Sequence, residues 1–268
     1  MNLNENTTTI NQATTLIKLN NNNNNNKDIS TSHFNLIPKQ ISNLFPHNDK
    51  WYQCKIIKTK EKGSTYLRLY SDDKESKYNN TLLYTAIKKQ NGNNYEIENI
   101  EHNETICVIK WNMFGNEFIV SDCIDNDILL MNYSFRIKGL TGPSKMKIVL
   151  PKKEEGTVKD WFDNTKEKMY DKHKVFVIEN KQPEYNNKYG CYVLKFKGRN
   201  VRKSVKNCQF VYAKGFDNDI NEKDKDEVLL QFAEVSDNCY VLDFKYPFSE
   251  LTAFAVGVIS SASKILCE

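Results

Sequence analysis

Basic residues between positions 195 and 206 are the densest group of side chains with evident chemistry in this sequence. The group comprises Lys195, Lys197, Arg199, Arg202, Lys203 and Lys206. Ammonium and guanidinium groups at this density suit a row of phosphates, such as a nucleic-acid backbone. The acid-rich stretch 217–227 that follows is most simply a solvated connection. A surface that binds nucleic acid is therefore one functional hypothesis, which we rank second.

The cysteines and histidines do not form a pattern typical of a metal site. The seven cysteines are odd in number, include no Cys-x-x-Cys pair and mostly lie in apolar runs. We interpret them as reduced packing residues of a cytosolic or nuclear protein. None of the four histidines stands at a ligand-like spacing from a cysteine. We therefore expect no metal ion and no other cofactor.

Motifs of common enzyme classes are missing from the sequence. It contains no Gly-x-Ser-x-Gly and no glycine loop that would cradle a phosphate. The formal net charge of +4 is too small to favour nucleic acid by itself, so an anion site must come from local clustering. We expect no signal peptide and no spanning helix, so that any contact with a membrane is peripheral. These features favour a binding module without enzymatic activity.

The composition divides the chain into two regions. Residues 1–44 are rich in Asn and Thr and include an unbroken Asn tract at 20–26. Such a segment buries too little apolar surface to offset its ordering entropy, so we expect a disordered tail. Beyond it, the sequence predicts one folded domain over 45–268, with a surface helix over 158–172.

Short runs of alternating apolar and polar residues predict strands through most of this domain. In the run 191–197, for example, Leu194 and Phe196 face one side, while Lys195 and Lys197 face the other. Turn signals such as Asn91-Gly92 separate the runs. The predicted strands are Trp51–Thr59, Thr65–Tyr70, Thr81–Lys88, Thr105–Asn112, Glu117–Ser121, Ser134–Lys138, Met146–Leu150, Lys174–Glu179, Cys191–Lys197, Gln209–Ala213, Val228–Ala233 and Tyr240–Tyr246.

The segment 249–262 predicts a helix that is apolar on every side. Only Thr252 interrupts the apolar run 251–259, which is too short to span a membrane. Ser249 is a candidate N-cap, and Glu250 would lie favourably in the first turn. A buried strand is the alternative, although Ala and Gly at 253, 255 and 257 disfavour it. A dozen strands before such a helix predict a mainly β fold, a closed antiparallel barrel of about twelve strands around a central hydrophobic C-terminal helix.

Two stretches resemble the tubby family. The sequence FKGRNVRKSVKNCQF at 196–210 is similar to a family motif with Phe, a polar residue, Gly-Arg, then Ser-Val-Lys-Asn and Gln. The sequence AFAVGVISSASKILCE at 253–268 is similar to the terminal segment of the family. Departures at Asn200, Lys203 and Cys208 are interpreted as repacking. The resemblance covers about residues 45–268 and implies a twelve-stranded barrel around a central helix.

The same resemblance implies a site for the head group of phosphatidylinositol 4,5-bisphosphate. Tubby-like domains bind this lipid through a basic pocket fed by a basic strand end and a basic residue on the next strand. The matching residues here are Lys88, Lys89 and Lys110. Their ammonium groups would form charge-assisted hydrogen bonds with vicinal phosphates. Adjacent strand residues point to opposite faces, so Lys88 and Lys89 share a pocket only if the strand ends there, and solvated strand lysines are the alternative.

The resemblance also implies a setting for the protein. It predicts a cytoplasmic protein held peripherally at the inner leaflet of the plasma membrane. Such a protein would leave the membrane when the lipid is hydrolysed, enter the nucleus, or carry membrane-protein cargo. The alternative function is a nucleic-acid-binding transcriptional regulator that uses the cluster 195–206. The structural interpretation of the same cluster is that Arg199 and Lys206, which lie inside the family motif, hold a loop in place. A scramblase-like lipid-handling barrel ranks third, because the expected terminal apolar span and cysteine-rich stretch are missing.

Overall fold

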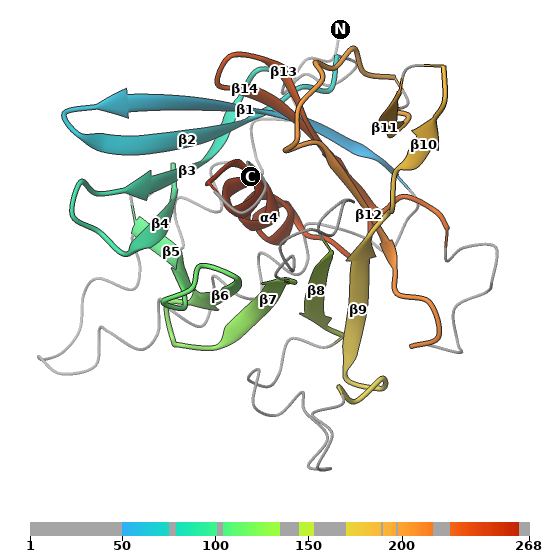
Figure 1. Ribbon diagram of the computed structural model, residues 1–268. Coiled ribbons are helices and arrows are strands. Elements are labelled where there is room, and N and C mark those ends of the chain that lie inside the picture. Colours follow the sequence, from blue (N-terminus) through green and yellow to red (C-terminus); the bar gives the residue numbers. More distant parts are fainter. Residues whose placement is uncertain are drawn as a thin grey trace, which may run out of the picture. The chain divides into compact units, whose positions relative to one another are not determined.

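Twelve antiparallel strands form a closed barrel in the computed structural model (Figure 1). The structure describes residues 50–74, 79–100, 104–134, 145–152, 170–188, 190–196, 198–216 and 226–262, all of which belong to one compact unit, Ile37–Glu268. The barrel strands are β1 (Tyr52–Glu61), β2 (Ser64–Ser71), β3 (Leu82–Lys88), β4 (Asn94–Asn99), β5 (Glu104–Trp111), β6 (Glu117–Asp122), β7 (Asp127–Tyr133), β8 (Met146–Pro151), β9 (Val175–Asn180), β12 (Cys208–Tyr212), β13 (Leu230–Ser236) and β14 (Cys239–Phe244). Strands adjacent in this series pair with each other, and β14 closes the ring on β1. The predicted barrel is confirmed.

Two barrel strands, β4 and β7, carry signals too weak to be predicted from the sequence. β4 has only Tyr95 and Ile97 as buried residues, between asparagines at both ends. β7 lacks alternation because Leu129, Leu130 and Met131 are all buried. Leu130 faces outward into a second, smaller apolar cluster that also contains Val149 and Val177. A strand buried on both faces loses its period of two.

Several sequence predictions need correction or lie outside the described residues. The predicted strand 191–197 ends early, because β11 (Cys191–Val193) pairs only with β10 (Glu184–Asn186) in a separate two-stranded sheet. Ser134 is not in a strand, and 135–138 lie outside the described residues. Residues 170–172 are not helical, and the rest of the predicted helix is not described. The predicted tail 1–44 is outside the described part as well.

The central helix is α4 (Glu250–Ala262), which runs inside the ring of strands in Figure 1. All residues from Ala253 to Ser261 are buried, as a helix apolar on every side requires. The Ser249 side chain caps the first turn, since its Oγ accepts a hydrogen bond from the Thr252 N–H at 3.2 Å. Phe254 stacks on Tyr84 of β3, with 6.2 Å between ring centroids. The predicted helix is confirmed, and the buried-strand alternative is wrong.

Gly257 allows α4 to pack closely against the barrel wall. A Cβ at this position would lie 2.6 Å from Ile56 Cδ1 on β1, well inside van der Waals contact. Ile56 is fully buried, so its side chain has little room to yield. The glycine is therefore a packing requirement of the helix in its barrel.

We expect Gly257→Ala to destabilise the protein by about 1–2 kcal/mol. Alanine has the higher helix propensity, but the strain of an extra methyl group in a packed core outweighs that gain in stability. Ile56→Val removes the clashing methyl group and alone costs about 1 kcal/mol. The double variant should then be about as stable as Ile56→Val alone in urea unfolding. Strictly additive losses would show that the close approach does not constrain the fold.

Glu250 lies in the first turn of α4, where burial raises the pKa of its carboxyl group to about 7. The sequence predicted a favourable carboxylate at this position because of the helix dipole, but desolvation outweighs it. Burial first, and the Glu250 charge second, raise the pKa of the Tyr52 hydroxyl group on β1. The end of the barrel near Tyr52 thus holds an acid that is costly to ionise.

A raised pKa makes Glu250 a source of pH-dependent stability. Below its ordinary pKa of 4.5 the group is protonated in both folded and unfolded chains, and its contribution is fully present. That contribution, at most about 3 kcal/mol, is lost as pH rises through about 7. Glu250→Gln should therefore unfold at higher urea concentration than the wild type at pH 8, with little difference at pH 4.5. A pH-independent difference would contradict this account.

Candidate functional site

The turns of the β1–β2, β3–β4 and β5–β6 hairpins lie together at one end of the barrel. A Cβ on Gly63 in the first turn would lie 2.6 Å from Gln90 Oε1 in the second, so these two turns touch. Asn94, at the start of β4, pairs with Lys110 near the end of β5. We call the lysines in and beside these three turns the basic rim, which comprises Lys60, Lys62, Lys88, Lys89 and Lys110.

Lys88 is the last residue of β3 and lies on the lumen side, in line with the buried Tyr84 and Ala86. Its Nζ is 4.9 Å from the centroid of the Trp111 ring, a cation–π contact. Trp111 is itself packed between Tyr95 and Phe118, at centroid distances of 6.0 and 6.2 Å. An aromatic floor thus supports Lys88 at the mouth of the barrel.

Lys89 and Lys110 lie on the outer face, opposite to Lys88. Lys89 follows the end of β3, and its Nζ is 3.0 Å from Glu96 Oε2. Lys110 is exposed, and in the described part of the chain its ammonium group has no hydrogen-bond or ion-pair partner. The structure therefore brings the three sequence-predicted lysines to one rim, with Lys88 on the lumen side of the barrel wall and the other two on its outer side.

Lys60 and Lys62 join the rim without having been predicted from the sequence. Thr65 of β2 pairs with both Lys60 of β1 and Lys88 of β3, which places the two lysines on the lumen side of one row. Lys62 is in the β1–β2 turn with a positive φ of 48°. The turn sequence Lys60-Glu61-Lys62-Gly63 was the signal that could have indicated these two lysines. Its proximity to β3, however, follows from strand pairing, which the sequence does not show.

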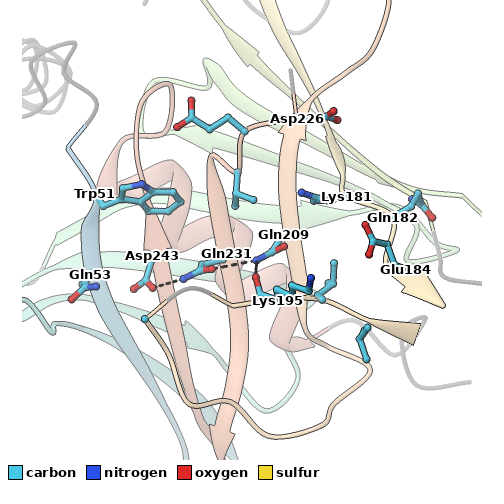
Figure 2. A pocket seen from close by; sticks show the side chains of 15 residues that line it. Trp51, Gln53, Lys181, Gln182, Glu184, Lys195, Gln209, Asp226, Gln231 and Asp243 are labelled. Atoms are coloured by element: carbon cyan, nitrogen blue, oxygen red, sulfur yellow. Dashed lines mark hydrogen bonds between the residues drawn. The ribbon is translucent and has the colours of Figure 1, made fainter. Parts of the chain in front are cut away.

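A groove of about 700 Å³ lies on the outer surface over β1, β12, β13 and β14 (Figure 2). Its floor is a lateral row of paired residues, Gln209, Gln231, Asp243 and Gln53. The Gln209 amide donates to the Lys195 carbonyl at 3.0 Å and to Gln231 Oε1 at 3.3 Å. The Gln231 amide donates to Asp243 Oδ2 at 2.7 Å. Most of the polar floor is satisfied within the protein, so the groove is a weaker candidate for ligand binding than the rim.

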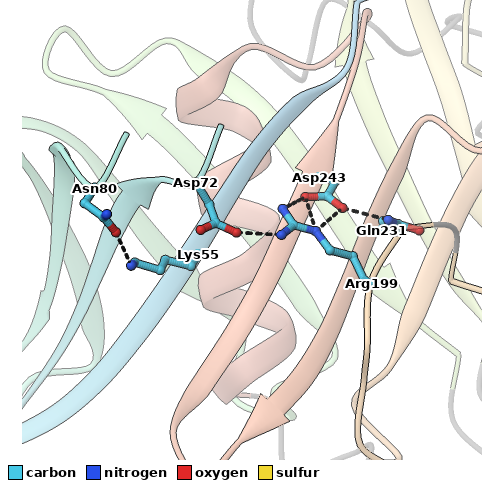
Figure 3. Close-up of polar contacts among 6 residues, drawn as sticks. All are labelled: Lys55, Asp72, Asn80, Arg199, Gln231 and Asp243. Atoms are coloured by element: carbon cyan, nitrogen blue, oxygen red, sulfur yellow. Dashed lines mark hydrogen bonds and ion pairs between the residues drawn. The ribbon is translucent and has the colours of Figure 1, made fainter. Parts of the chain in front are cut away.

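Arg199 holds together three segments that are far apart in the sequence (Figure 3). Its Nη1 is 2.5 Å from Asp72 Oδ2 after β2, and its Nη2 is 2.5 Å from Asp243 Oδ1 on β14. The Nε also donates to Asp243 Oδ2 at 2.9 Å. The Asp243 hydrogen bond is the main cause that raises the pKa of the guanidinium group. With 11% of its side chain exposed, Arg199 serves the fold and is not available to an external phosphate.

Other cations of the cluster 195–206 are also engaged in contacts within the protein. Lys206 donates to the Ser261 carbonyl at the end of α4 at 3.1 Å and lies over the Tyr240 ring. Arg202 forms an ion pair with Asp237 at the surface. Lys195 and Lys203 are exposed, and Lys197 lies outside the described side chains. The densest basic stretch of the sequence is therefore split by the fold.

Comparisons with known proteins agree with this architecture. A family model described as the Tub family matches residues 43–263. The chain belongs to the tubby family. It is 29% identical to "Tubby-related protein 2" of Mus musculus over 81% of this chain and 43% of the relative. It is 26% identical to "Tubby-related protein 3" of Homo sapiens over 81% of this chain and 54% of the relative. The chain thus spans about half the length of these curated relatives.

The described part of this tubby-family domain offers neither a metal centre nor a spanning helix. No group of three or more His, Cys, Asp or Glu side chains there is arranged to hold a metal ion. None of the described helices is long and apolar enough to cross a membrane. The buried cysteines carry no evident reactivity, since burial raises the pKa of the Cys208 thiol to about 12.

Arg199→Lys should destabilise the tubby-family barrel by about 2 kcal/mol, because a single ammonium group does not replace a fork that bridges two carboxylates. Arg202→Lys is the matched control, since the Arg202–Asp237 pair is solvent-exposed and should leave the thermal midpoint unchanged. Thermal unfolding followed by circular dichroism distinguishes the two. Equal midpoints for both variants would show that the Arg199 bridge is dispensable.

Proposed function

We propose that this tubby-family domain binds the head group of phosphatidylinositol 4,5-bisphosphate at the basic rim. The observation that carries the proposal is the convergence of Lys88, Lys89 and Lys110 on neighbouring strand ends. Lys88 reaches the rim from the lumen side, whereas Lys89 and Lys110 reach it from the outer side. A bisphosphate seated over the start of β4 would accept charge-assisted hydrogen bonds from both sides.

The surroundings of these lysines support an anion site. Of the three, only Lys89 has a carboxylate partner among the described residues, and both side chains of that pair are at the surface. An exposed pair of this kind contributes little to stability, so a phosphate replaces the carboxylate at small cost. Lys60 and Lys62 add positive charge beside the site and favour polyanionic head groups.

The proposed site gives reversible attachment to a membrane. Each basic residue near an anionic leaflet contributes about 1 kcal/mol, so a few lysines tether the protein without anchoring it permanently. Hydrolysis of the lipid would separate the head group that the rim holds from the membrane. We therefore infer a peripheral protein at the inner face of the plasma membrane, which returns to the cytoplasm or enters the nucleus and acts as a signal or a carrier of membrane-protein cargo.

Nucleic-acid binding through the cluster 195–206 is not the function we propose. Arg199, Arg202 and Lys206 have partners within the protein, and only Lys195 and Lys203 of the described cluster remain as exposed cations without one. Two separated lysines release few counterions from a nucleic acid. The lipid proposal is therefore the one to test first.

Co-sedimentation with liposomes of matched net charge tests the proposed site. The wild type should prefer the 4,5-bisphosphate to a monophosphate or to phosphatidylserine at equal charge. Loss of one rim lysine should weaken binding roughly fivefold, and Lys88→Ala with Lys110→Ala roughly thirtyfold, at about 1 kcal/mol per lysine.

Lys195→Ala with Lys203→Ala is the matched control, because it removes the same charge from exposed positions outside the rim. This control should bind lipid like the wild type. Equal losses in both double variants would indicate attraction by net charge alone. Binding that ignores the arrangement of phosphates would contradict a head-group site.

A further inference from the structure

The β5–β6 turn carries two large apolar side chains at the tip of a tightly closed hairpin. Met113 is 92% exposed and Phe114 is 69% exposed. Asn112 closes the turn, because its Oδ1 accepts from the Asn116 N–H at 3.2 Å and its carbonyl accepts from the Gly115 N–H at 3.0 Å. Gly115 has a positive φ of 68°, which glycine adopts without strain. The backbone of the turn thus holds Met113 and Phe114 outward.

This exposure is unusual for a turn of this kind. Tight turns normally carry Gly, Asn, Asp or Ser at the tip, whereas this turn carries two large apolar side chains that are mostly exposed. Met113 is the most exposed of the large apolar side chains in the described part of the protein. Two adjacent apolar side chains in such a position are suited to contact with an apolar medium.

The turn projects directly from the basic rim. Lys110 pairs with Ile119, Trp111 pairs with Phe118, and the Asn112 N–H donates to the Glu117 carbonyl at 3.0 Å. The tip therefore lies roughly 7 Å beyond Lys110 along the strand direction, at about 3.4 Å per residue. Apolar groups of interfacial proteins reach about 5–10 Å into the boundary between head groups and acyl chains. With Lys110 at the level of the phosphates, Met113 and Phe114 would reach that boundary.

A second turn at the opposite end of the barrel offers an internal comparison. In the β6–β7 turn Ile124 is 51% exposed, and the Asp122 carboxylate accepts from its N–H at 3.0 Å. Asp125 and Asp127 stand in or beside the same turn. Carboxylates repel an anionic leaflet, so this apolar tip is not suited to one. The β5–β6 turn has one flanking carboxylate, that of Glu117, and it differs from the β6–β7 turn in the lysines on the strand ends at its base.

A lipid surface fits this turn better than a protein partner does. Two side chains on one narrow tip bury far less than the roughly 1,000 Å² that a specific protein interface needs. The same two side chains suffice to strengthen the attachment of a domain already held by its lysines. Phe and Met beside Trp111 and Lys110 give the hairpin an apolar tip and a cationic base.

We propose that the β5–β6 turn inserts Met113 and Phe114 into the interfacial region of an anionic bilayer while the basic rim holds a phosphoinositide head group. This inference rests on the proposed function, since the lysines bring the turn to the membrane. It adds that the protein recognises the head group in a bilayer more strongly than the same phosphates in free solution.

Two binding measurements on the full chain separate insertion from head-group recognition. The first is co-sedimentation with phosphatidylcholine vesicles containing about 5% of the bisphosphate, and the second is calorimetric titration with soluble inositol 1,4,5-trisphosphate. Met113→Ser with Phe114→Ser should lower vesicle binding about tenfold or more and leave the soluble ligand unaffected. Ile124→Ser, the matched control, should leave both unchanged. Lys88→Ala with Lys110→Ala should weaken both.

Depth-dependent quenching tests the position of the tip directly. The fluorescence of the Phe114→Trp variant should be quenched by lipids brominated near the upper acyl chain, beyond the wild-type background. The fluorescence of the Ile124→Trp variant should not be quenched in this way. Equal vesicle binding by the Met113/Phe114 double variant, or an unquenched signal from the Phe114→Trp variant, would overturn insertion while leaving head-group recognition intact. Failure of the wild type to bind either vesicles or the soluble ligand would overturn both proposals.

Discussion

The packing of α4 against the inner faces of the strands is the interaction on which the rest of the structure depends. A closed sheet has no free edges, but a barrel of twelve strands encloses more space than its own side chains fill. α4 occupies that space with residues buried on every side, and Gly257 lets it approach Ile56 on β1. We expect neither part to be stable alone, because each presents an apolar surface that the other covers.

A filled lumen determines where the protein can meet a ligand. Ligands of many barrels bind inside, whereas here the interior is a packed core in which strand residues such as Ile56 and helix residues such as Phe254 belong to one apolar cluster. Binding must therefore use the rims and the outer surface. Because consecutive antiparallel hairpins turn at alternate ends, every second turn contributes to the same rim. Lys62, Lys89 and the base of the β5–β6 turn lie at one end, and Asp72, Asp122 and Asp125 lie at the other.

The outer polar network shows why conspicuous charges in a sequence need not be available to an external ligand. Arg199 bridges Asp72 and Asp243, and Gln231 links Asp243 to Gln209 beneath the segment that follows β11. These side-chain contacts hold the irregular segment around Lys195 and Arg199 against the barrel. A mostly buried guanidinium group between two carboxylates is satisfied internally, whereas the exposed ammonium group of Lys110 has no such partner among the described residues.

Local patterns in the sequence determined the helix, most of the strands and the family, because each of these rests on residues close together in the chain. The apolar run 251–259 favours a buried helix over a buried strand because of its Ala and Gly residues, and alternation indicates strands that are buried on one face. β7 was not predicted, because residues from distant segments cover its outer face and its sequence therefore lacks alternation. Only the tertiary structure decided which charges meet. Lys60 joins Lys88 across β2, and Arg199 joins Asp72, because sheet register and barrel closure bring together residues whose separation in the sequence carries no local signal.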